Sequence, residues 1–197
     1  MEKINYDKIF QNTVQNLDGK KRLLLHCCCA PCSVAVLERL ADFFCVSLYF
    51  YNPNIDTEEE YFLRAGELEK IAPAFGVKEI IVEPYNPQEF LSAVKGLESE
   101  PEGGRRCLSC FGLRLEQAAR YAQKKGYDYF STTLTVSPHK NSAAVNEAGE
   151  VAAKDKGVRF LYADFKKREG YKRSGILSEK FGLYRQNYCG CEFSKRP

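Results

Sequence analysis

The chain alternates between short apolar runs and longer segments in which apolar residues recur with helical spacing. Apolar runs typical of buried strands lie at 21–28, 43–52, 77–85, 127–137 and 158–165. Segments with helical periodicity lie between them, at 33–43, 58–75, 87–99, 107–126 and 141–157. Continuous apolar strands that alternate with helices predict an α/β fold, in which a parallel five-stranded sheet carries helices on both faces.

Three distinctive loops follow the first, second and fourth predicted strands. They read HCCCAPC at 26–32, YNPN at 51–54 and TLTVSPHK at 133–140. Because ligands of open parallel sheets bind beyond the carboxyl ends of the strands, we expect these loops to converge on one edge and form the site. The sequence contains neither a glycine-rich dinucleotide fingerprint nor a P-loop, which disfavours the usual nucleotide cofactors.

Length and composition fit a single domain, with 197 residues, 44% hydrophobic and 28% charged. No run approaches the roughly 20 apolar residues that cross a bilayer, and the polar N-terminus lacks the apolar region of a secretory signal. We therefore expect a cytoplasmic protein without a membrane partner. In that reducing compartment the nine cysteines indicate metal binding or redox chemistry, and only two histidines are available as competing ligands.

Cys107 and Cys110 form a C-x-x-C pair at the predicted start of a helix, about one turn apart on the same face. The positive end of the helix dipole and the preceding Arg105 and Arg106 are expected to favour thiolates there. The simpler alternative is a pair of buried cysteines whose spacing is a coincidence.

The segment from His26 to Cys32 carries four sulfurs within six residues at the end of the first predicted strand. Adjacent strand residues face opposite ways, so some of these sulfurs must point beyond the sheet edge. A second C-x-x-C, Cys29 and Cys32, combines with Cys107 and Cys110 into a strong signal for a four-thiolate site. The spacing does not choose between zinc and an iron–sulfur cluster, so a structural zinc site stays open.

Cys189 and Cys191 flank Gly190 near the C-terminus. A disulfide between them would close a small, strained ring, and strain makes a disulfide easier to reduce. The glycine gives the backbone freedom to form and break that bond, so we interpret the pair as a redox couple. Two further metal ligands or two idle thiols are the alternatives. Cys45 lies within an apolar run and is expected to be a core residue.

The C-terminal segment 164–197 is basic and aromatic, and we interpret it as an extension of one catalytic domain spanning 1–197. From residue 166 onward it has nine Lys or Arg and three Asp or Glu, a net +6, which leaves −3 on the rest because the whole chain carries +3. Cations for phosphates and rings for unstacked bases are the components with which proteins bind single-stranded RNA. The cations expected to do so are Lys140, Lys172, Arg173 and Arg185. The alternative is a solvated basic surface whose aromatic residues pack inward.

Six segments, in order along the chain, together resemble the QueH-type epoxyqueuosine reductases, which do not use cobalamin. They are HxCCAP at 26–31, YNPNI at 51–55 followed by Tyr61 and Arg64, RCxxC at 106–110, TLTVSPHK at 133–140, DFKKREG at 164–170 and YRQNYCGC at 184–191. The resemblance runs from the first predicted strand to the C-terminus. It implies a Rossmann-like fold akin to the adenine-nucleotide α-hydrolases without their phosphate loop, a [4Fe–4S] cluster and a tRNA substrate.

Carried over residue by residue, the resemblance implies a cluster held by four cysteines, Cys28, Cys29, Cys107 and Cys110. It also implies that Cys189 and Cys191 are the redox-active pair. This ligand set replaces the C-x-x-C pairing of Cys29 with Cys32. Cys32 is then left as a ligand of one additional iron beside the cluster, and Cys27 lies outside the motif.

The activity that the resemblance implies is conversion of epoxyqueuosine to queuosine by two-electron removal of the epoxide oxygen. The substrates would be tRNAs for Tyr, His, Asn and Asp with G at the wobble position, and the sequence does not identify the electron donor. Two other function classes stay open from the residues alone. One is a zinc-stabilised RNA-binding module without catalysis, and the other is a metal-free thiol–disulfide oxidoreductase.

Overall fold

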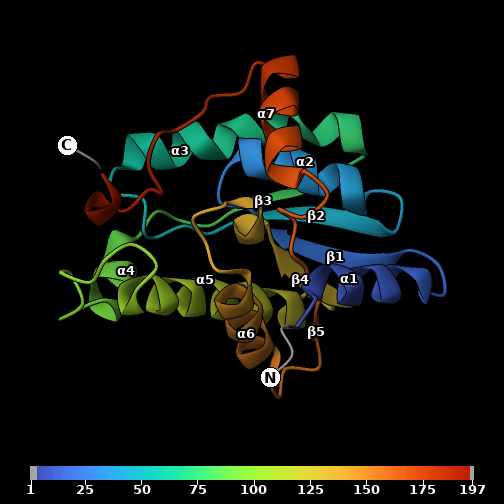
Figure 1. The fold of residues 1–197 in the computed structure, drawn as a ribbon, viewed down its shortest axis with the longest axis horizontal. Coiled ribbons are helices and arrows are strands. Elements are labelled where there is room, and N and C mark those ends of the chain that lie inside the picture. Colours follow the sequence, from blue (N-terminus) through green and yellow to red (C-terminus); the bar gives the residue numbers. More distant parts are fainter. Residues whose placement is uncertain (1–3, 196–197) are drawn as a thin grey trace.

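Five parallel strands form the central sheet of the computed structural model, which describes residues 4–195. They are β1 (Lys21–His26), β2 (Phe44–Phe50), β3 (Ile80–Val82), β4 (Tyr129–Thr132) and β5 (Arg159–Phe160), in the spatial order β3-β2-β1-β4-β5 (Figure 1). The predicted α/β fold with a parallel five-stranded sheet is confirmed. The chain runs outward from β1 to β3 and then returns to β4 on the other side of β1, so the topological switch point lies at the carboxyl end of β1.

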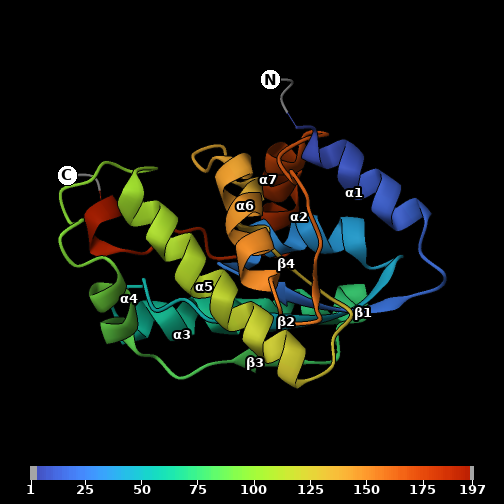
Figure 2. The same cartoon turned by 90° about the horizontal axis from the view of Figure 1, so that it is seen from below.

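Helices cover both faces of the sheet, as predicted (Figures 1 and 2). One face carries α1 (Tyr6–Gln15), α2 (Ala30–Leu40), α3 (Glu58–Gly66) and α7 (Gly170–Lys180), and the other carries α5 (Arg105–Lys124) and α6 (Ser142–Ala153). The short helix α4 (Pro87–Ala93) packs against α5. Leu23 and Leu25 of β1 join the core on the α2 side and Leu24 joins the core on the α5 side, so this strand is apolar throughout.

Two helices, α1 and α7, lie in segments where the sequence predicts no element. α1 buries only Phe10 and Val14, one turn apart, and α7 buries the small side chain of Ser174 with Leu177. The apolar face of α7 gives little periodic signal, whereas the amphipathic pattern of α1 is present in the sequence. Because α7 packs against α2, part of the basic C-terminal segment is a layer of the fold. Its last two residues, 196–197, lie outside the described part of the chain.

Proline accounts for two differences between the expected and observed helices. Segment 29–32, expected as a loop, is the N-cap and first turn of α2, because Pro31 is favoured in a first helical turn. The helix expected over 58–75 ends at Gly66 and continues as two 3₁₀ helices, η1 (Glu67–Lys70) and η2 (Ala72–Phe75). Pro73 prevents one continuous α-helix through this segment, because it cannot donate a hydrogen bond to the Glu69 carbonyl, but it lies too far along the chain to explain the end of α3.

Three strands are shorter than expected. β3 and β5 occupy the two edges, where each has a single neighbour, and pair over three and two residues. β4 stops at Thr132, whose Oγ1 accepts from Leu134 N–H and caps the 3₁₀ helix η3 (Thr133–Val136). The edges therefore stay irregular, whereas β1 pairs with β2 along its whole length.

Cys45, expected in the core, is exposed. It is the second residue of β2 and points to the same face as Tyr49, which is buried on the α5 side. The helices cover that face only along the later part of the strand, so the expectation for Cys45 is wrong. Among the helices of residues 4–195, none combines the length and the apolar character needed to cross a membrane.

Candidate metal and redox site

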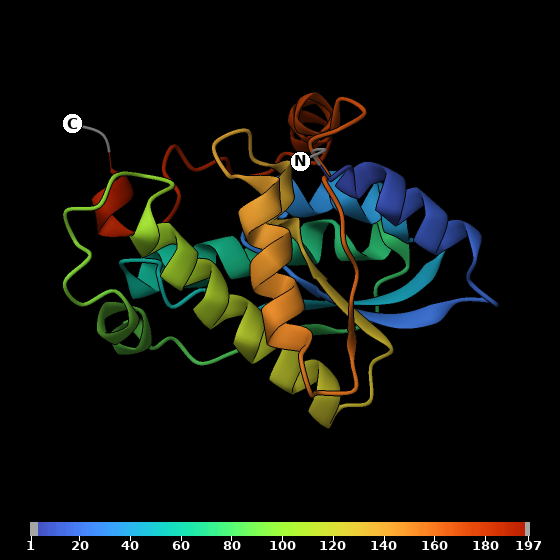
Figure 3. The same cartoon turned by 60° about the horizontal axis from the view of Figure 1, so that its bottom comes forward.

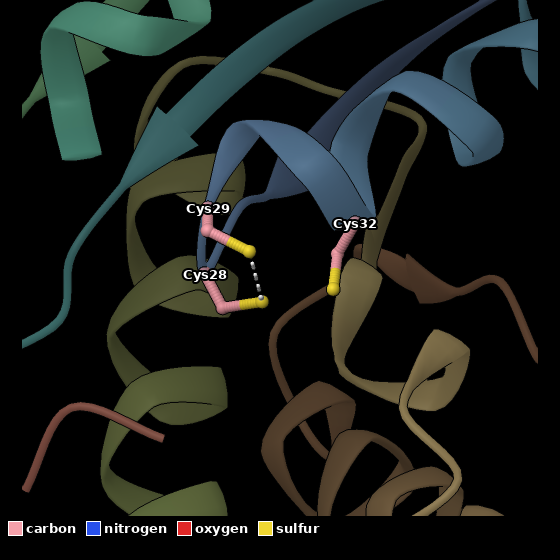
Figure 4. Close-up of side chains that lie close together, drawn as sticks. All are labelled: Cys28, Cys29 and Cys32. Atoms are coloured by element: carbon pink, nitrogen blue, oxygen red, sulfur yellow. Dashed lines mark hydrogen bonds between the residues drawn. The ribbon is translucent and has the colours of Figure 1, made fainter. Parts of the chain in front are cut away.

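Three cysteine sulfurs come together where β1 ends and α2 begins. The Sγ atoms of Cys28, Cys29 and Cys32 all lie within 4.8 Å of one another, and Figure 4 shows them directed into one space. Cys29 is the N-cap of α2 and Cys32 lies in its first turn, so the start of the helix creates this three-sulfur group. Within the described range 4–195, no other set of His, Cys, Asp or Glu side chains is grouped as closely.

The thiols of the three-sulfur group do not ionise independently. Hydrogen bonds from Cys29 and Cys32 hold the pKa of Cys28 well below its usual range. The hydrogen bond that Cys29 shares with Cys28 in turn raises the pKa of Cys29 to about 12. The Cys28 Sγ also lies 3.4 Å from Thr133 Oγ1, which accepts from the Cys28 N–H at 3.2 Å. One thiolate is therefore favoured here, and further deprotonation requires a bound cation.

A cavity of about 310 Å³ opens beside the three-sulfur group. Its wall includes Cys28, Cys29, Cys32, Arg114, Lys140, Tyr171, Arg185, Gln186 and Cys189. Although burial opposes the charge of Lys140, the nearby Cys189 and Cys28 keep its pKa above the usual value. The loops that follow β1 and β4 thus meet at the predicted edge, together with the C-terminal segment.

Cys107 and Cys110 lie on the first turns of α5 and line a second cavity of about 30 Å³, which shares Lys140 and Cys189 with the larger one. Neither belongs to the three-sulfur group. Cys110 instead packs with Cys191 in a small apolar cluster. Burial raises the pKa of Cys110 to about 11, so the helix start does not by itself make this thiol a thiolate, contrary to expectation. A bound cation would be needed to favour the thiolate of Cys110.

The two arginines that precede Cys107 are committed to other partners. Arg105 pairs with Glu100, with 2.9 Å between Nε and Oε1. Arg106 donates to the Glu98 carbonyl at 2.7 Å. The Cys107 Sγ accepts instead from the Gly103 N–H at 3.2 Å. The loop before α5 therefore holds Cys107 through its backbone.

Backbone hydrogen bonds hold the Cys189-Gly190-Cys191 segment. Arg64 Nη1 donates to the Cys189 carbonyl at 3.2 Å, and the Asp56 N–H donates to the Gly190 carbonyl at 3.1 Å. The segment leads into the 3₁₀ helix η4 (Glu192–Ser194), which lies beside the start of α5 (Figure 3). Both cysteines are free thiols, and Cys189 lines both cavities.

One central residue, Arg114, is absent from the sequence-based prediction. Its guanidinium is 1% exposed and contacts three groups: Cys110 Sγ at 3.9 Å, His26 Nε2 at 3.4 Å and Asn52 Oδ1. Arg114 follows Cys107 and Cys110 at helical spacing, so the three side chains share one face of α5. That spacing is the signal that could have identified it.

The four cations expected to contact RNA occupy two different places. Lys140 and Arg185 line the larger cavity. Lys172 is exposed on α7, and Arg173 is held in a two-point ion pair with Glu38 at 2.7 and 2.8 Å. Only the first two therefore lie at the cysteine site itself.

The aromatic residues of the C-terminal segment are mostly used inside the protein. Phe165 is buried in the core, the Tyr188 hydroxyl donates to Asp56 at 2.7 Å, and the Tyr184 hydroxyl donates to Glu60 at 3.1 Å. Tyr171 and Tyr184 are both exposed, at 47% and 37%, but of these two only Tyr171 lines the cavity.

A solved structure supports the fold assignment. The U34-tRNA thiolase NcsA from Methanococcus maripaludis, solved with its [4Fe–4S] cluster, matches with a TM-score of 0.57. The match covers 97% of this chain and 67% of that chain at 12% sequence identity. At this identity the likeness shows a shared fold and nothing more.

Sequence comparisons identify relatives over nearly the whole chain. The family model described as Epoxyqueuosine reductase QueH matches residues 23–197. The epoxyqueuosine reductase QueH of Streptococcus pyogenes serotype M1 is 40% identical over an alignment that covers 99% of this chain and 80% of that protein. The protein of the same name from Thermotoga maritima is 37% identical, with coverage of 87% and 89%. The chain therefore belongs to the QueH family of epoxyqueuosine reductases, which are oxidoreductases.

Proposed function

We propose that the chain reduces epoxyqueuosine to queuosine at the wobble position of cytoplasmic tRNAs for Tyr, His, Asn and Asp. Membership of the QueH family supports the reaction. The structural observation that carries the proposal is the position of Cys189, which lines both the cavity beside the three-sulfur group and the cavity beside Cys107 and Cys110. A thiol that borders both sets of cysteines is well placed to exchange electrons with a group bound by them.

The donor set fits a thiolate-bound iron–sulfur cluster, because cysteines form the one close group of three or more metal-ligating side chains among the described residues. The buried guanidinium of Arg114, which contacts Cys110 and lines the cavity with Cys28, is a cation suited to an anionic group. We assign a [4Fe–4S] cluster to four thiolates, those of Cys28, Cys29, Cys107 and Cys110. Cys32 completes the three-sulfur group and is assigned to one additional iron beside the cluster.

The reaction sets a fixed requirement for electrons and protons. Both carbon–oxygen bonds of the epoxide break, a carbon–carbon double bond forms and water leaves, which consumes two electrons and two protons. Oxidation of the Cys189 and Cys191 thiols to a disulfide releases the same number of each. When bound, an iron–sulfur cluster supplies single-electron transfer or Lewis-acid polarisation of an oxygen. An external reductant, still unidentified, then restores the dithiol.

Residues of the chain bind and orient the substrate. Gln186 Oε1 is buried and has no hydrogen-bond partner among the described residues, so it is available to a base in the cavity. Tyr171 offers a ring on which a base can stack, and Lys140 and Arg185 offer charges for the adjoining phosphates. A cavity of about 310 Å³ suits one extruded base.

The decisive experiment uses protein that is prepared and loaded with iron anaerobically. It is incubated with dithionite and tRNA that carries epoxyqueuosine, and the nucleosides are analysed by mass spectrometry. We expect loss of one oxygen. An unchanged nucleoside mass, in protein whose iron and acid-labile sulfide are complete, would contradict the proposal.

Metal analysis of the same preparation separates the alternatives. Iron together with acid-labile sulfide supports the cluster. Zinc without iron would support a zinc-stabilised RNA-binding module instead. Reduction of protein disulfides by metal-free chain would support a thiol–disulfide oxidoreductase.

A further inference from the structure

One buried cation of the site has no carboxylate partner among the described residues. Arg114 is 1% exposed, and across residues 4–195 no carboxylate oxygen lies within 4.0 Å of its guanidinium nitrogens. Its contacts are the amide oxygen of Asn52, the imidazole of His26 and the thiol of Cys110. A charge that is removed from water without a partner is strongly unfavourable, so this position calls for an anion.

Another buried arginine of the chain shows what a compensated charge looks like here. Arg64, 2% exposed, pairs with Glu60 at 2.6 Å. Arg114 is as deeply buried but has a sulfur where Arg64 has a carboxylate. The difference indicates that the anion for Arg114 is provided by the sulfur site.

We propose that Arg114 is the built-in counter-cation of the thiolate-bound cluster and that its charge raises the reduction potential of that cluster. Arg114 contacts Cys110 and lines the cavity with Cys28, one cysteine from each pair assigned to the cluster. Its charge therefore acts on any anion that the two pairs share. This inference rests on the cluster assignment made above.

Asn52 fixes the guanidinium in this position. The Asn52 Oδ1 accepts from Arg114, while the Asn52 Nδ2 donates to the Cys27 carbonyl at 2.9 Å. The charge on α5 is thereby tied to the end of β1, where the three-sulfur group begins. Asn52 is 1% exposed, so water does not compete for these bonds.

The direction of the effect follows from charge. Reduction adds one electron, and so one negative charge, to the cluster. A fixed cation at short range stabilises the more negative state, and nearby charge and hydrogen bonds to sulfur are known levers on cluster potentials. Removing the charge of Arg114 should therefore shift the potential to more negative values.

The test is a potentiometric titration of iron-loaded full-length protein, followed by visible absorption and electron paramagnetic resonance. We expect Arg114→Met to shift the cluster potential to more negative values and Arg114→Lys to shift it less, because the charge is kept. An unchanged potential in Arg114→Met with complete iron would overturn the inference. If Arg114→Met fails to hold iron, the iron content of Arg114→Lys decides. Iron retained by Arg114→Lys supports a charge effect, and a loss of iron equal to that of Arg114→Met overturns the inference.

Thermal melting gives a readout that a merely structural arginine would not produce. In iron-loaded protein we expect Arg114→Met to lower the melting temperature. In iron-free protein the same substitution should leave the melting temperature unchanged or raise it, because the unpaired charge is gone. Arg39→Met is the matched control: Arg39 of α2 is mostly buried and pairs with Asp7 of α1, and neither residue lines the two cavities. That control should lower the melting temperature in both forms, and the same loss in both forms for Arg114→Met would overturn the inference.

The parent protein separates this inference from the proposed function. A parent without iron and sulfide would overturn the cluster assignment and the inference with it. A parent with a complete cluster, together with an unshifted potential in Arg114→Met, would overturn the role of Arg114 alone.

Discussion

Gly190 lies directly against Asn54. A Cβ atom on Gly190 would stand 3.0 Å from Asn54 Nδ2, and the φ angle of Gly190 is +126°, which L side chains rarely adopt. The glycine between the two cysteines therefore lets the C-terminal segment approach the YNPN loop closely. Gly190 therefore allows close packing at a defined position, in addition to the flexibility inferred from the sequence.

Replacing Gly190 with alanine should displace the Cys-Gly-Cys segment. The added methyl group meets Asn54 Nδ2 at 3.0 Å and Arg64 Nη1 at 3.3 Å and also forces an unfavourable φ. We expect a loss of about 1 to 3 kcal/mol in unfolding free energy, measured by urea denaturation, together with lower turnover. Gly182→Ala is the control, because Gly182 has a φ of +59° but open space around its Cβ position. Equal losses in the two variants would contradict a close-packing role.

Replacing Cys189 with serine should abolish turnover and leave the iron content normal. Serine cannot form the proposed disulfide, whereas the proposed cluster ligands are untouched. Iron and sulfide analysis and nucleoside mass spectrometry measure the two quantities. Cys45→Ser, at an exposed position on β2, should retain both. Loss of iron in Cys189→Ser would instead identify this thiol as a metal ligand.

Substitutions of Cys29 and Cys32 should have different effects on the iron and sulfide content, although the two sulfurs belong to the same three-sulfur group. Cys29→Ser removes a proposed cluster ligand, so we expect loss of iron, acid-labile sulfide and visible absorption together. Cys32→Ser should keep the sulfide and lose at most the one additional iron. The measurement is the iron-to-sulfide ratio of each variant. Complete loss of sulfide in Cys32→Ser would move Cys32 into the cluster ligand set.

Neutralising Arg185 should weaken tRNA binding in a salt-dependent way. Arg185 is exposed and lines the larger cavity, so it is free to contact a phosphate. We expect Arg185→Gln to lower the slope of log affinity against log salt concentration by about one. Arg173→Gln should change it less, because Glu38 already neutralises Arg173. Lys20→Gln is the control, because Lys20 precedes β1 and so lies at the amino ends of the strands, away from the cavity. An equal change in the salt dependence of this variant would contradict a local contact.

Asp7 should make the stability of the fold depend on pH. Partial burial opposes ionisation of its carboxylate, but hydrogen bonds from Arg39 at 2.7 Å and Arg168 at 3.0 Å hold its pKa below the usual value. The stabilisation is therefore present above the unfolded-state pKa of about 3.9 and is lost as pH falls through the folded-state value. Asp7→Asn should cost about 2 kcal/mol at pH 7 by chemical denaturation. The difference should shrink below about pH 4, and a constant difference would contradict this account.

The central strand and the long helix were predictable, whereas the two terminal helices were not. β1 stands out in the sequence because its buried residues form a continuous run, and the helix at 107–126 because its burial repeats with helical period. α7 does not, because it buries few and small side chains and depends on α2 for a surface to pack against, whereas α1 is amphipathic although it buries only Phe10 and Val14. The lengths of β3 and β5 were also unpredictable, since pairing at a sheet edge depends on a neighbour distant in sequence.

For the site, the sequence was enough to predict the sheet, the edge at which the loops meet and the cysteines that we propose carry the chemistry. How those cysteines are grouped could be seen only in the folded chain. Pro31 starts α2 early and brings Cys32 to Cys28, burial sets Cys110 beside Cys191, and Arg114 lies unpaired between them. The physical reason is that spacing along the chain reports local geometry, whereas burial and charge compensation depend on contacts between segments distant in sequence.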